Sequence, residues 1–494
     1  MDTKYKKTAA GLMLICLAAS LFFGIPVQAK GKWPKGPSKS SISAESAIVM
    51  DINTGTILYK KNIHDKHYPA SITKIMTTLL CLENASLTDT VKFSATAVNS
   101  IEFGSSHIGV IANEKLNMED CLYGIMLMSA NEVCNGVAEH IGGSIQGFVD
   151  MMNDRAKELG CKNTHFANPN GLYLDDHYTS AYDMALISSA AMKNSVFRKI
   201  TGTKTYRIEK TNLKEERLLY NKHGMLYPIK WPKYGYEYCI GGKTGYTDKA
   251  RWTLVTFAKK DDLELVCVVM KTGGPPPIEP NEYTDTTALL NYAIDNYKSY
   301  PIEASGNKVD KETKYALFSK YDTFFDDENS PIYIEEGASV VLPNNIDIKD
   351  AKKTIEYYDD KVLDDGVNVI GKIVYTYDNV VAGSANIMYD TDKAEVKNLN
   401  EELMEYVNEM EESEPDEPEE VVEETEKPAN EDTKEKALPF GLDMRTVIII
   451  GGAFLFIILL IIIIVIIKSR RSKRYISPYS GGRYNRRRRK KYKF

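Results

Sequence analysis

Apolar residues recur along this chain with two different periods, which predicts a body that mixes helices and strands. Between Ile72 and Leu80 they recur at helical spacing, and similar patterns dominate from Ser71 to about Ser195. Two other stretches, Ser46 to Lys60 and Trp252 to Met270, are rich in strand-forming residues and contain turn residues near their middle. We therefore expect one β-hairpin before the helical region and another after it.

The second part of the body has shorter elements. A helix is expected from Thr284 to Tyr297, and short alternating segments such as Gly371–Asp378 and Val381–Tyr389 follow it. The body is too long for one ordinary domain. We therefore expect a larger domain of strands and helices at residues 43–297 and a small β-rich domain at residues 301–395.

The N-terminus has the pattern of an export signal. A basic start is followed by an apolar run from Ala9 to about Ile25, and Val27-Gln-Ala29 offers small residues at the right offset for cleavage. Residues 1–29 are therefore interpreted as a secretory signal peptide, with an uncleaved membrane anchor as the alternative.

A second apolar run lies near the C-terminus. Residues 447–467 are 21 residues without a charge, long enough for a helix to cross the roughly 30 Å core of a bilayer. Residues 468–494 contain 13 Lys or Arg and no acid, and such flanks stay cytoplasmic. This pattern predicts a single-pass protein of the cell membrane, with an extracellular body and a basic cytoplasmic tail. The tail run 486–491 could contact anionic lipid or nucleic acid; lipid is favoured because it is permanently at hand, and no nucleic-acid partner is expected.

The segment between the body and the span is strongly acidic. Residues 401–436 carry 17 acids against 3 lysines, too polar to bury a core, so an extended disordered linker is expected. The formal net charge of −6 hides this division between an acidic linker and a basic tail. The overall charge therefore says little about partners.

Six cysteines remain after the predicted signal peptide: Cys81, Cys121, Cys134, Cys161, Cys239 and Cys267. An even number in an exported chain allows disulfides. Most of these residues lie in apolar runs, where cysteine acts as a small hydrophobe, and no metal-ligand spacing is present. Buried free thiols are the favoured interpretation.

The first candidate for chemistry is Ser71-Ile-Thr-Lys74 at the start of a predicted helix. The spacing places Lys74 one turn from Ser71, where a lysine that burial has made less basic can take the proton of the hydroxyl. The alternative is that Ser71 only caps the helix and Lys74 reaches solvent. Alone the motif is weak, because Ser305-Gly-Asn-Lys308 repeats it in a polar stretch.

Two further motifs give Ser71 a context. Ser129-Ala-Asn131 follows an apolar run and can aim a hydroxyl and an amide into one cleft, although a simple helix junction is the alternative. Ile240-Gly-Gly-Lys-Thr-Gly-Tyr246 is expected on a strand whose edge could pair with an extended peptide. The letters recur at Lys271-Thr-Gly273, at the end of the second strand of the later hairpin; we set this copy aside because its position after the hairpin, running into three prolines, suits a loop.

The three motifs in this order resemble the penicillin-recognising serine enzymes, and most closely the low-molecular-weight D-alanyl-D-alanine carboxypeptidases of the peptidase S11 type. The resemblance extends through Phe103-Gly-Ser-Ser106, Asn163 to Leu172 and His177 to Ala185, and covers about Ser43 to Tyr297. It implies an α/β (α+β) catalytic domain at residues 43–297, in which helices flank an antiparallel sheet.

The resemblance also implies a mechanism that removes the terminal D-alanine from peptidoglycan stem peptides. Ser71 would attack the carbonyl between two D-alanines, and Lys74 would take its proton. The oxyanion would lie between the backbone N–H groups of Ser71 and Tyr246. Ser129 would help to protonate the leaving D-alanine, and Lys243 would lower the pKa of its neighbours.

Other residues would bind the substrate. Asn131 would orient it, Thr244 would bind its terminal carboxylate, and Gly245 completes the motif beside it. β-Lactams, which are similar to the dipeptide, would acylate Ser71 and inhibit the enzyme. The resemblance implies no cofactor and no metal.

The chain departs from the family at a few positions. Many relatives carry an arginine after the second hairpin that assists carboxylate binding, whereas Glu282 is found there, and Arg251 is a possible substitute. A frequent Asn-x-Asn is replaced by Asn221-Lys-His223. A β-lactamase or a non-catalytic cell-wall scaffold are the alternative functions. The first would need a deacylating carboxylate that the sequence does not offer, and the second a broken motif.

Overall fold

The computed structural model describes residues 32–229, 232–273, 281–302, 330–358 and 363–393. The predicted signal peptide, acidic linker, membrane span, basic tail and Ser305–Lys308 motif lie outside the described residues. Within the described ranges no helix is both long and apolar enough to cross a membrane.

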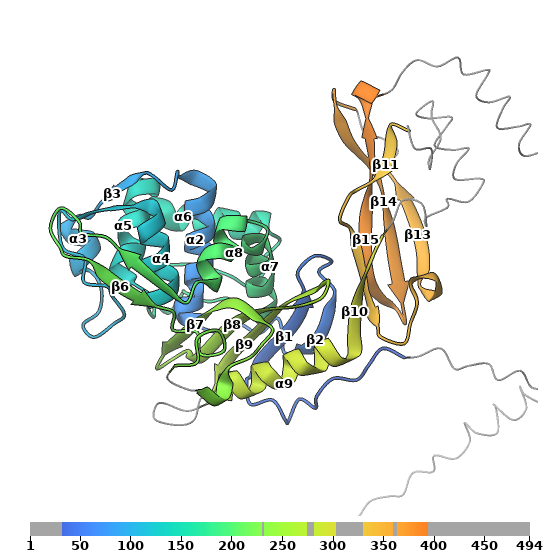
Figure 1. The fold of residues 1–494 in the computed structure, drawn as a ribbon, viewed down its shortest axis with the longest axis horizontal. Coiled ribbons are helices and arrows are strands. Elements are labelled where there is room, and N and C mark those ends of the chain that lie inside the picture. The colour runs from blue at the N-terminus through green and yellow to red at the C-terminus, as the bar shows by residue number, and fades with distance from the viewer. Residues whose placement is uncertain (1–31, 230–231, 274–280, 303–329, 359–362, 394–494) are drawn as a thin grey trace, which may run out of the picture. The chain divides into compact units, whose positions relative to one another are not determined.

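The larger part of the structure is built on a five-stranded antiparallel sheet (Figure 1). Its strands, in spatial order, are β2 (Ile57–Lys61), β1 (Ser46–Asp51), β9 (Leu263–Thr272), β8 (Arg251–Lys260) and β7 (Cys239–Thr247). The two predicted hairpins are confirmed as β1–β2 and β8–β9, which pair through β1 and β9. This arrangement leaves β7, the strand with the Lys-Thr-Gly motif, at one edge of the sheet.

Helices cover both faces of this sheet. They are η1 (Ala70–Thr73), α2 (Lys74–Asn84), α3 (Ala95–Asn99), α4 (Met118–Met128), α5 (Asn131–Gly142), α6 (Ile145–Glu158), α7 (Ala181–Met192), α8 (Ser195–Gly202) and α9 (Asn281–Asn296). Short strand pairs β3 (Thr90–Lys92) with β4 (Lys115–Asn117) and β5 (Thr205–Ile208) with β6 (Arg217–Tyr220) lie among them. Figure 1 shows α9 on the face opposite α2, α7 and α8.

The strand side chains explain why both faces are covered. In β1, Ile48 and Met50 belong to the core under the helices α2 to α8, whereas Ala47 and Val49 pack in a second core with Leu289 of α9. Successive residues of a strand point to opposite faces, so a strand that is apolar at every position must be buried on both sides. The α+β architecture is therefore confirmed.

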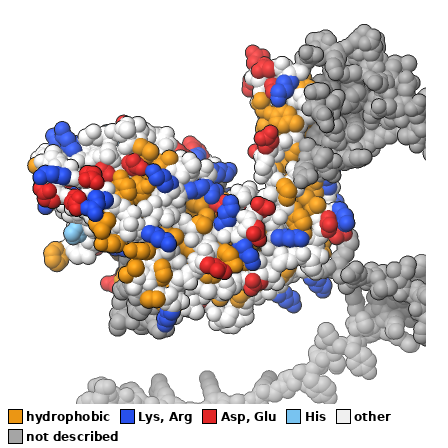
Figure 2. Space-filling model, viewed as in Figure 1, with side chains coloured by type: hydrophobic (Ala, Val, Ile, Leu, Met, Phe, Trp, Pro, Cys, Tyr) orange, Lys and Arg blue, Asp and Glu red, His pale blue; other side chains and the backbone are white. Residues whose placement is uncertain are grey.

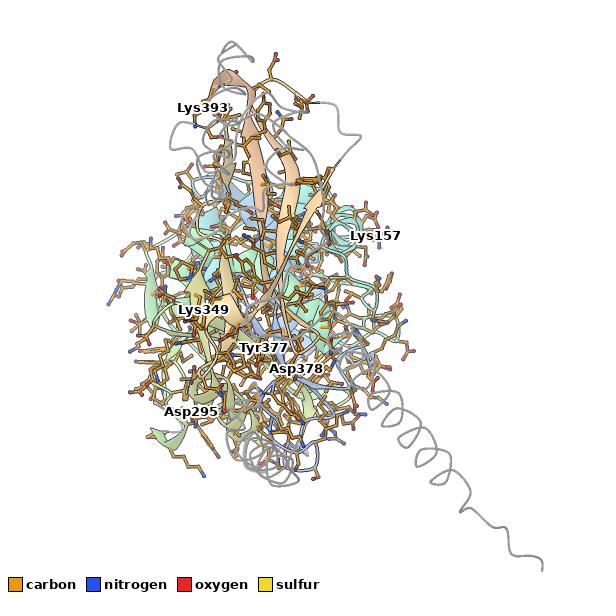
Figure 3. The ribbon with its side chains drawn as sticks, turned by 90° about the vertical axis from the view of Figure 1, so that its right-hand side faces the viewer. Lys157, Asp295, Lys349, Tyr377, Asp378 and Lys393 are labelled. Carbon is orange, nitrogen blue, oxygen red and sulfur yellow. The ribbon has the colours of Figure 1, made fainter. Side chains whose placement is uncertain are left out.

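The residues after α9 form a six-stranded antiparallel sheet. Its strands are β10 (Tyr297–Pro301), β12 (Ser339–Pro343), β15 (Val380–Asp390), β14 (Val367–Tyr377) and β13 (Lys352–Tyr357), with β11 (Ile332–Ile334) paired to β15. The predicted strands at Gly371–Asp378 and Val381–Tyr389 are confirmed as the β14–β15 hairpin. Figure 3 labels Tyr377 and Asp378 at its turn, where Asp378 and Asn379 both have positive φ, as a two-residue hairpin turn requires.

The predicted helix at Thr284–Tyr297 needs a correction at both ends. Helix α9 begins three residues earlier, at Asn281, and ends at Asn296, because Tyr297 is the first residue of β10 and pairs with Pro343. The Tyr297 ring is buried against Trp33, with ring centroids 5.3 Å apart, and its hydroxyl bonds that of Tyr292 at 2.8 Å. Burial of this ring in contacts distant in sequence overrides the helical pattern.

All six cysteines of the described body are free thiols, which confirms the favoured interpretation. Five are buried, and Cys161 is half-buried. On the face seen in Figure 2, acidic and basic side chains are interspersed over the described surface, so this face presents no extended patch of one sign.

Because Glu282 is buried in the first turn of α9, we expect the stability of the protein to depend on pH. Glu282 is 3% exposed, its Oε2 finds no hydrogen-bond partner among the described residues, and burial raises its pKa from 4.5 to about 7. Between these two values the folded protein holds a proton that the unfolded chain releases, so the free energy of unfolding falls as pH rises through this window. Glu282→Gln, which mimics the protonated form, should therefore stabilise the protein above pH ~7, by on the order of 3 kcal/mol at most.

Urea unfolding of the wild type and the variant below and above this window checks the prediction. The exposed Glu336 provides the matched control, since Glu336→Gln should change little at either pH. Equal effects of Glu282→Gln at both pH values would contradict it.

Candidate active site

Ser71 lies in a short 3-10 turn that leads into a buried helix. Pro69 precedes this turn, η1, and Lys74 is the first residue of α2. Lys74 is fully buried, and its Nζ lies 2.9 Å from Ser71 Oγ and 2.7 Å from Asn131 Oδ1. A third hydrogen bond goes to the backbone carbonyl of Asn170. The Asn131 Oδ1 atom and the Asn170 carbonyl thus hold the amino group of Lys74 next to the Ser71 hydroxyl.

Burial makes Lys74 a weaker base than an ordinary lysine. Desolvation is the main cause, and the positive charge of Lys222 adds to it, so that the pKa of Lys74 falls from 10.5 to about 8. A lysine with this pKa is partly neutral near physiological pH. It can therefore accept the proton of Ser71, which the usual ammonium form cannot.

Ser129 and Asn131 lie at the junction of two helices. Helix α4 ends at Met128 because Ser129 adopts a left-handed conformation with φ of 63°, which is uncommon for a residue with a side chain. Helix α5 then begins at Asn131, whose backbone N–H donates to the carbonyl of Ser106 at 2.9 Å. The predicted junction is confirmed: Ser129 is the C-cap of α4, and its backbone N–H donates to the Gly124 carbonyl.

Lys243 connects this junction to the sheet. It lies on β7, is 2% exposed, and its Nζ donates to Ser129 Oγ at 3.1 Å and to the Thr244 carbonyl at 2.8 Å. Desolvation, with the charges of Lys74 and Lys222, holds the pKa of Lys243 well below its usual value. Two hydroxyl–lysine pairs, Ser71 with Lys74 and Ser129 with Lys243, therefore lie in one buried polar cluster.

Gly245 allows β7 to approach the serine. A Cβ atom at Gly245 would lie 2.4 Å from Thr253 Oγ1 and 2.9 Å from the backbone nitrogen of Ser71. Thr253, on the neighbouring strand β8, also binds the segment before Ser71, since its hydroxyl donates to the Pro69 carbonyl at 2.8 Å. The backbone of β7 next to Tyr246 is thus fixed against the N–H of Ser71, and only glycine fits between them.

The structure adds residues that the sequence did not assign. Lys222 is a third lysine of the cluster: burial lowers its pKa, and its Nζ donates to Ser106 Oγ at 3.2 Å. The Glu132 carboxylate accepts a hydrogen bond from Ile108 N at 2.8 Å and so binds the loop between α3 and β4. The stretches with Ser106 and Asn170 were part of the family resemblance, but no sequence signal showed that a backbone carbonyl of Asn170 would bind Lys74.

Of the departures from the family pattern, Asn221-Lys-His223 brings Lys222 into the cluster, whereas Glu282 and Arg251 lie elsewhere. Glu282 is buried in the first turn of α9. Arg251 pairs with Thr247 at the end of β7 and is half-buried near Tyr246. The repeated Lys271-Thr-Gly motif lies at the end of the second hairpin strand, as expected: Lys271 and Thr272 end β9, and β8 separates them from β7.

The described residues contain no group of three or more His, Cys, Asp or Glu placed to hold a metal ion. The contacts of Ser71 with Lys74 and of Ser129 with Lys243 provide a serine nucleophile and two lysines that can carry protons. The arrangement fits acyl transfer, in which a hydroxyl attacks a carbonyl and the lysines move the proton.

The pKa of Lys74 predicts the pH dependence of acylation at Ser71. Only neutral Lys74 can take the proton, so the acylation rate constant should rise about tenfold per pH unit below pH ~8 and level off above it. Lys222→Gln removes a charge that lowers this pKa, so the rising part of the curve should move to higher pH. Acylation by a fluorescent penicillin between pH ~6 and ~10 measures both curves.

The exposed Lys204 provides the control, since Lys204→Gln should leave the profile in place. A wild-type rate that is independent of pH through this range would contradict a neutral Lys74 as the base.

Comparison with known proteins is consistent with this geometry. The family D-alanyl-D-alanine carboxypeptidase (peptidase S11) matches residues 33–274. The chain is 33% identical over 355 residues to D-alanyl-D-alanine carboxypeptidase DacF of Bacillus subtilis, over 71% of this chain and 83% of that relative. It is 29% identical over 373 residues to DacA of Haemophilus influenzae, over 73% and 88%. Among solved structures, penicillin binding protein 5 from Haemophilus influenzae has a TM-score of 0.54 and 26% identity, over 72% of this chain and 98% of that one.

Proposed function

This chain belongs to the D-alanyl-D-alanine carboxypeptidase family of serine peptidases, and we propose that it removes the terminal D-alanine from peptidoglycan stem peptides through an acyl-enzyme at Ser71. The observation that carries the proposal is the contact of 2.9 Å between Ser71 Oγ and the buried Nζ of Lys74. A nucleophile needs a base within hydrogen-bond distance, and this pair provides one.

In the first step, Ser71 Oγ attacks the carbonyl carbon between the two D-alanines while Lys74 takes the hydroxyl proton. The negative charge passes to the carbonyl oxygen, which the N–H groups of Ser71 and Tyr246 stabilise. The close approach that Gly245 permits supports this pairing, because it holds β7 beside the nitrogen of Ser71.

In the second step, the tetrahedral intermediate expels D-alanine. The C–N bond breaks, and the amine of the leaving D-alanine takes a proton through Ser129, whose hydroxyl contacts Lys243 at 3.1 Å. Asn131, bound to Lys74, orients the peptide. Water then attacks the ester carbon, the bond to Ser71 breaks, and Ser71 recovers a proton.

Thr244 and a nearby cation bind the carboxylate of the terminal D-alanine. Thr244 is half-buried next to Lys243 on the edge strand. Lys222 and Arg251 are the two candidates for the cation: Lys222 Nζ contacts Ser106 Oγ at 3.2 Å, and Arg251 pairs with Thr247 at the end of β7.

The two alternative functions lack this support. A β-lactamase needs a group that hydrolyses the penicilloyl ester, and within the described residues no carboxylate forms a hydrogen bond with Ser71 or Lys74. A non-catalytic scaffold would not need two buried hydroxyl–lysine pairs, each of which costs desolvation energy.

We test the function with the full-length protein in detergent, incubated with a muropeptide that ends in D-alanyl-D-alanine. Release of D-alanine, blocked by stoichiometric penicillin, is the expected result. Rapid hydrolysis of penicillin itself would show a β-lactamase. Stable penicillin labelling without D-alanine release would show that the site binds but does not turn over the peptide, which contradicts the proposal.

The topology is part of the same proposal. Export by residues 1–29 and a single span at residues 447–467 would hold the catalytic domain, residues 43–297, and the β-rich domain, residues 301–395, outside the cell on the acidic linker. The apolar runs and the basic tail of the sequence support this arrangement. The β-rich sheet has a hydrophobic core of its own, which supports the domain division.

A further inference from the structure

The proposed function fixes the direction in which a peptide lies along β7. The terminal carboxylate is placed at Thr244 and the reacting carbonyl at the N–H of Tyr246, so the substrate chain runs antiparallel to the strand. An extended chain advances about 3.3 Å per residue. The residue that precedes D-alanyl-D-alanine therefore lies beside Thr247 and the turn that follows it, which contains Lys249.

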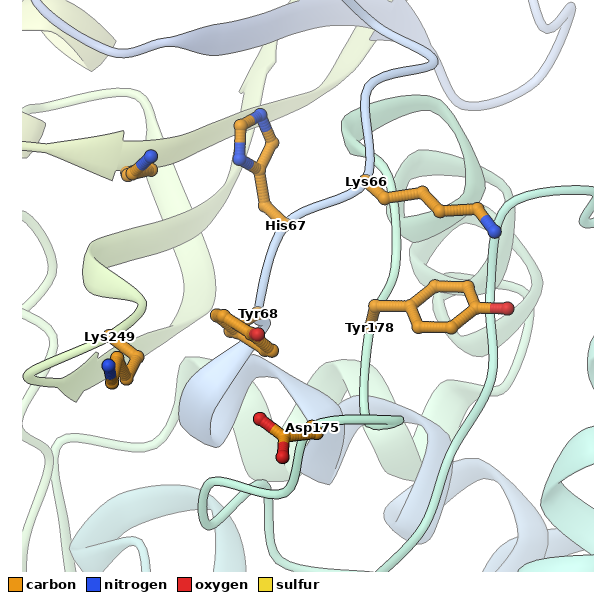
Figure 4. Close-up of a pocket in the computed structure, with 7 residues that line it drawn as sticks. Lys66, His67, Tyr68, Asp175, Tyr178 and Lys249 are labelled. Carbon is orange, nitrogen blue, oxygen red and sulfur yellow. The ribbon is translucent and has the colours of Figure 1, made fainter.

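A pocket opens at this end of the sheet. Its volume is about 260 Å³, and it is lined by Lys66, His67, Tyr68, Asp175, Tyr178, Lys249 and Lys271. Figure 4 shows Tyr68 and Asp175 facing each other across it, with His67 above Tyr68 and Lys249 at one side. Tyr68 precedes Ser71 by three residues and Lys249 follows Tyr246 by three, so the pocket is lined by the chain segments that lead into and out of the proposed reaction centre.

Aromatic rings connect the strand end to the pocket. The rings of Tyr68 and Tyr173 pack edge to face with centroids 5.0 Å apart, and Lys249 Nζ lies 5.9 Å from the Tyr173 centroid. The hydroxyl of Tyr173 donates to Asp175 Oδ1, so one oxygen of this carboxylate already has a hydrogen-bond partner. The rings form a wall along which the stem of a side chain can pack, with an ammonium group at its edge.

The pocket carries an excess of positive charge. Three lysines face one aspartate, and one of the lysines, Lys271, is paired with Glu45 at 3.0 Å. Lys66 lies over the ring of Tyr178, with its Nζ 4.1 Å from the centroid. In the described part of the chain neither Lys66 nor Lys249 has a carboxylate within salt-bridge distance. Two cations are therefore available to a ligand.

We propose that this pocket, which we call the lysine pocket, binds a carboxylate on the side chain of the residue that precedes D-alanyl-D-alanine, and so makes the enzyme prefer acidic over amidated stem peptides. The inference rests on the proposed function, since the direction of the substrate follows from the placement of the reaction. Lys249 makes the main contact, and Lys66 adds a longer-range attraction.

The test compares two synthetic peptides that end in D-alanyl-D-alanine and differ only at the preceding residue, which carries a side-chain carboxylate or the corresponding amide. For the full-length protein, kcat/KM should be higher for the acid. Lys249→Gln should reduce the acid-to-amide ratio by about fivefold, the size of an exposed ion pair of about 1 kcal/mol. Addition of Lys66→Gln should reduce it further, and Lys249→Glu should favour the amide. Higher salt should weaken the wild-type preference.

Lys157 is the matched control. It is an exposed lysine on α6, labelled in Figure 3, and its ammonium pairs with Asp154. Lys157→Gln should leave the ratio unchanged. If the acid-to-amide ratio of kcat/KM is the same for the wild type and Lys249→Gln, the proposed role of the lysine pocket is overturned, while the carboxypeptidase function stands. If neither peptide releases D-alanine, the proposed function itself has failed, and the pocket loses its premise.

Discussion

Lys74→Met should reduce the rate of Ser71 acylation by about 10²- to 10⁴-fold, the contribution of a positioned general base. Methionine fills the space of the buried lysine stem but cannot take the proton of a hydroxyl 2.9 Å away. The rise of the rate around pH ~8 should disappear with the same substitution, because the titrating group is gone. Time-resolved labelling with a fluorescent penicillin measures both effects.

A purely structural role of Lys74 would give a different result. Its Nζ also bonds Asn131 Oδ1 and the Asn170 carbonyl, so the substitution leaves two buried acceptors unpaired and lowers stability. Thermal unfolding separates this loss from the chemical one. A folded Lys74→Met protein that is acylated at nearly the wild-type rate would show that another group is the base.

Gly245→Ala should reduce acylation by about 10²- to 10³-fold, as the loss of one oxyanion-hole donor does in other enzymes. The new Cβ atom would lie 2.9 Å from the Ser71 nitrogen and 3.1 Å from the Ala70 Cβ, so β7 and η1 must separate. That movement takes Tyr246 N–H away from Ser71 N–H, and the two donors no longer converge on one oxygen. The acylation rate constant with penicillin measures the effect.

A second substitution distinguishes misalignment from general crowding. The shortest contact of the new Cβ atom is to Thr253 Oγ1, at 2.4 Å. Adding Thr253→Ala to Gly245→Ala removes this contact and should recover part of the thermal stability. It leaves the contact with the Ser71 nitrogen, so acylation should stay low. Full recovery of acylation in the double variant would contradict the oxyanion role of this strand.

Local periodicity was sufficient to predict the elements that depend on it. The β1–β2 and β8–β9 hairpins and the start of α2 follow from alternating or helical apolar positions and from turn residues nearby. The end of α9 does not, because Tyr297 is buried against Trp33, which lies far away in the sequence. Contacts of this kind carry no signal in a local window.

The sequence also predicted part of the candidate site. Its motifs pointed to Ser71, Lys74 and Lys243, because hydroxyl and amine side chains at a fixed spacing can be recognised in a sequence. The carbonyl of Asn170 that binds Lys74 could not be found, since every residue has a carbonyl and only the fold selects one. The role of Lys222 was also missed, because its effect on Lys74 depends on burial and not on spacing.

In the proposed mechanism Ser71 is the residue that carries the acyl group. We would incubate the full-length protein with penicillin, digest it, and locate the adduct by tandem mass spectrometry, with Ser71→Ala and Ser129→Ala in parallel. We expect one penicilloyl ester, on Ser71, that is present in the wild type, forms slowly in Ser129→Ala and is absent in Ser71→Ala. An adduct on Ser129, or D-alanine release that persists in Ser71→Ala, would contradict this mechanism.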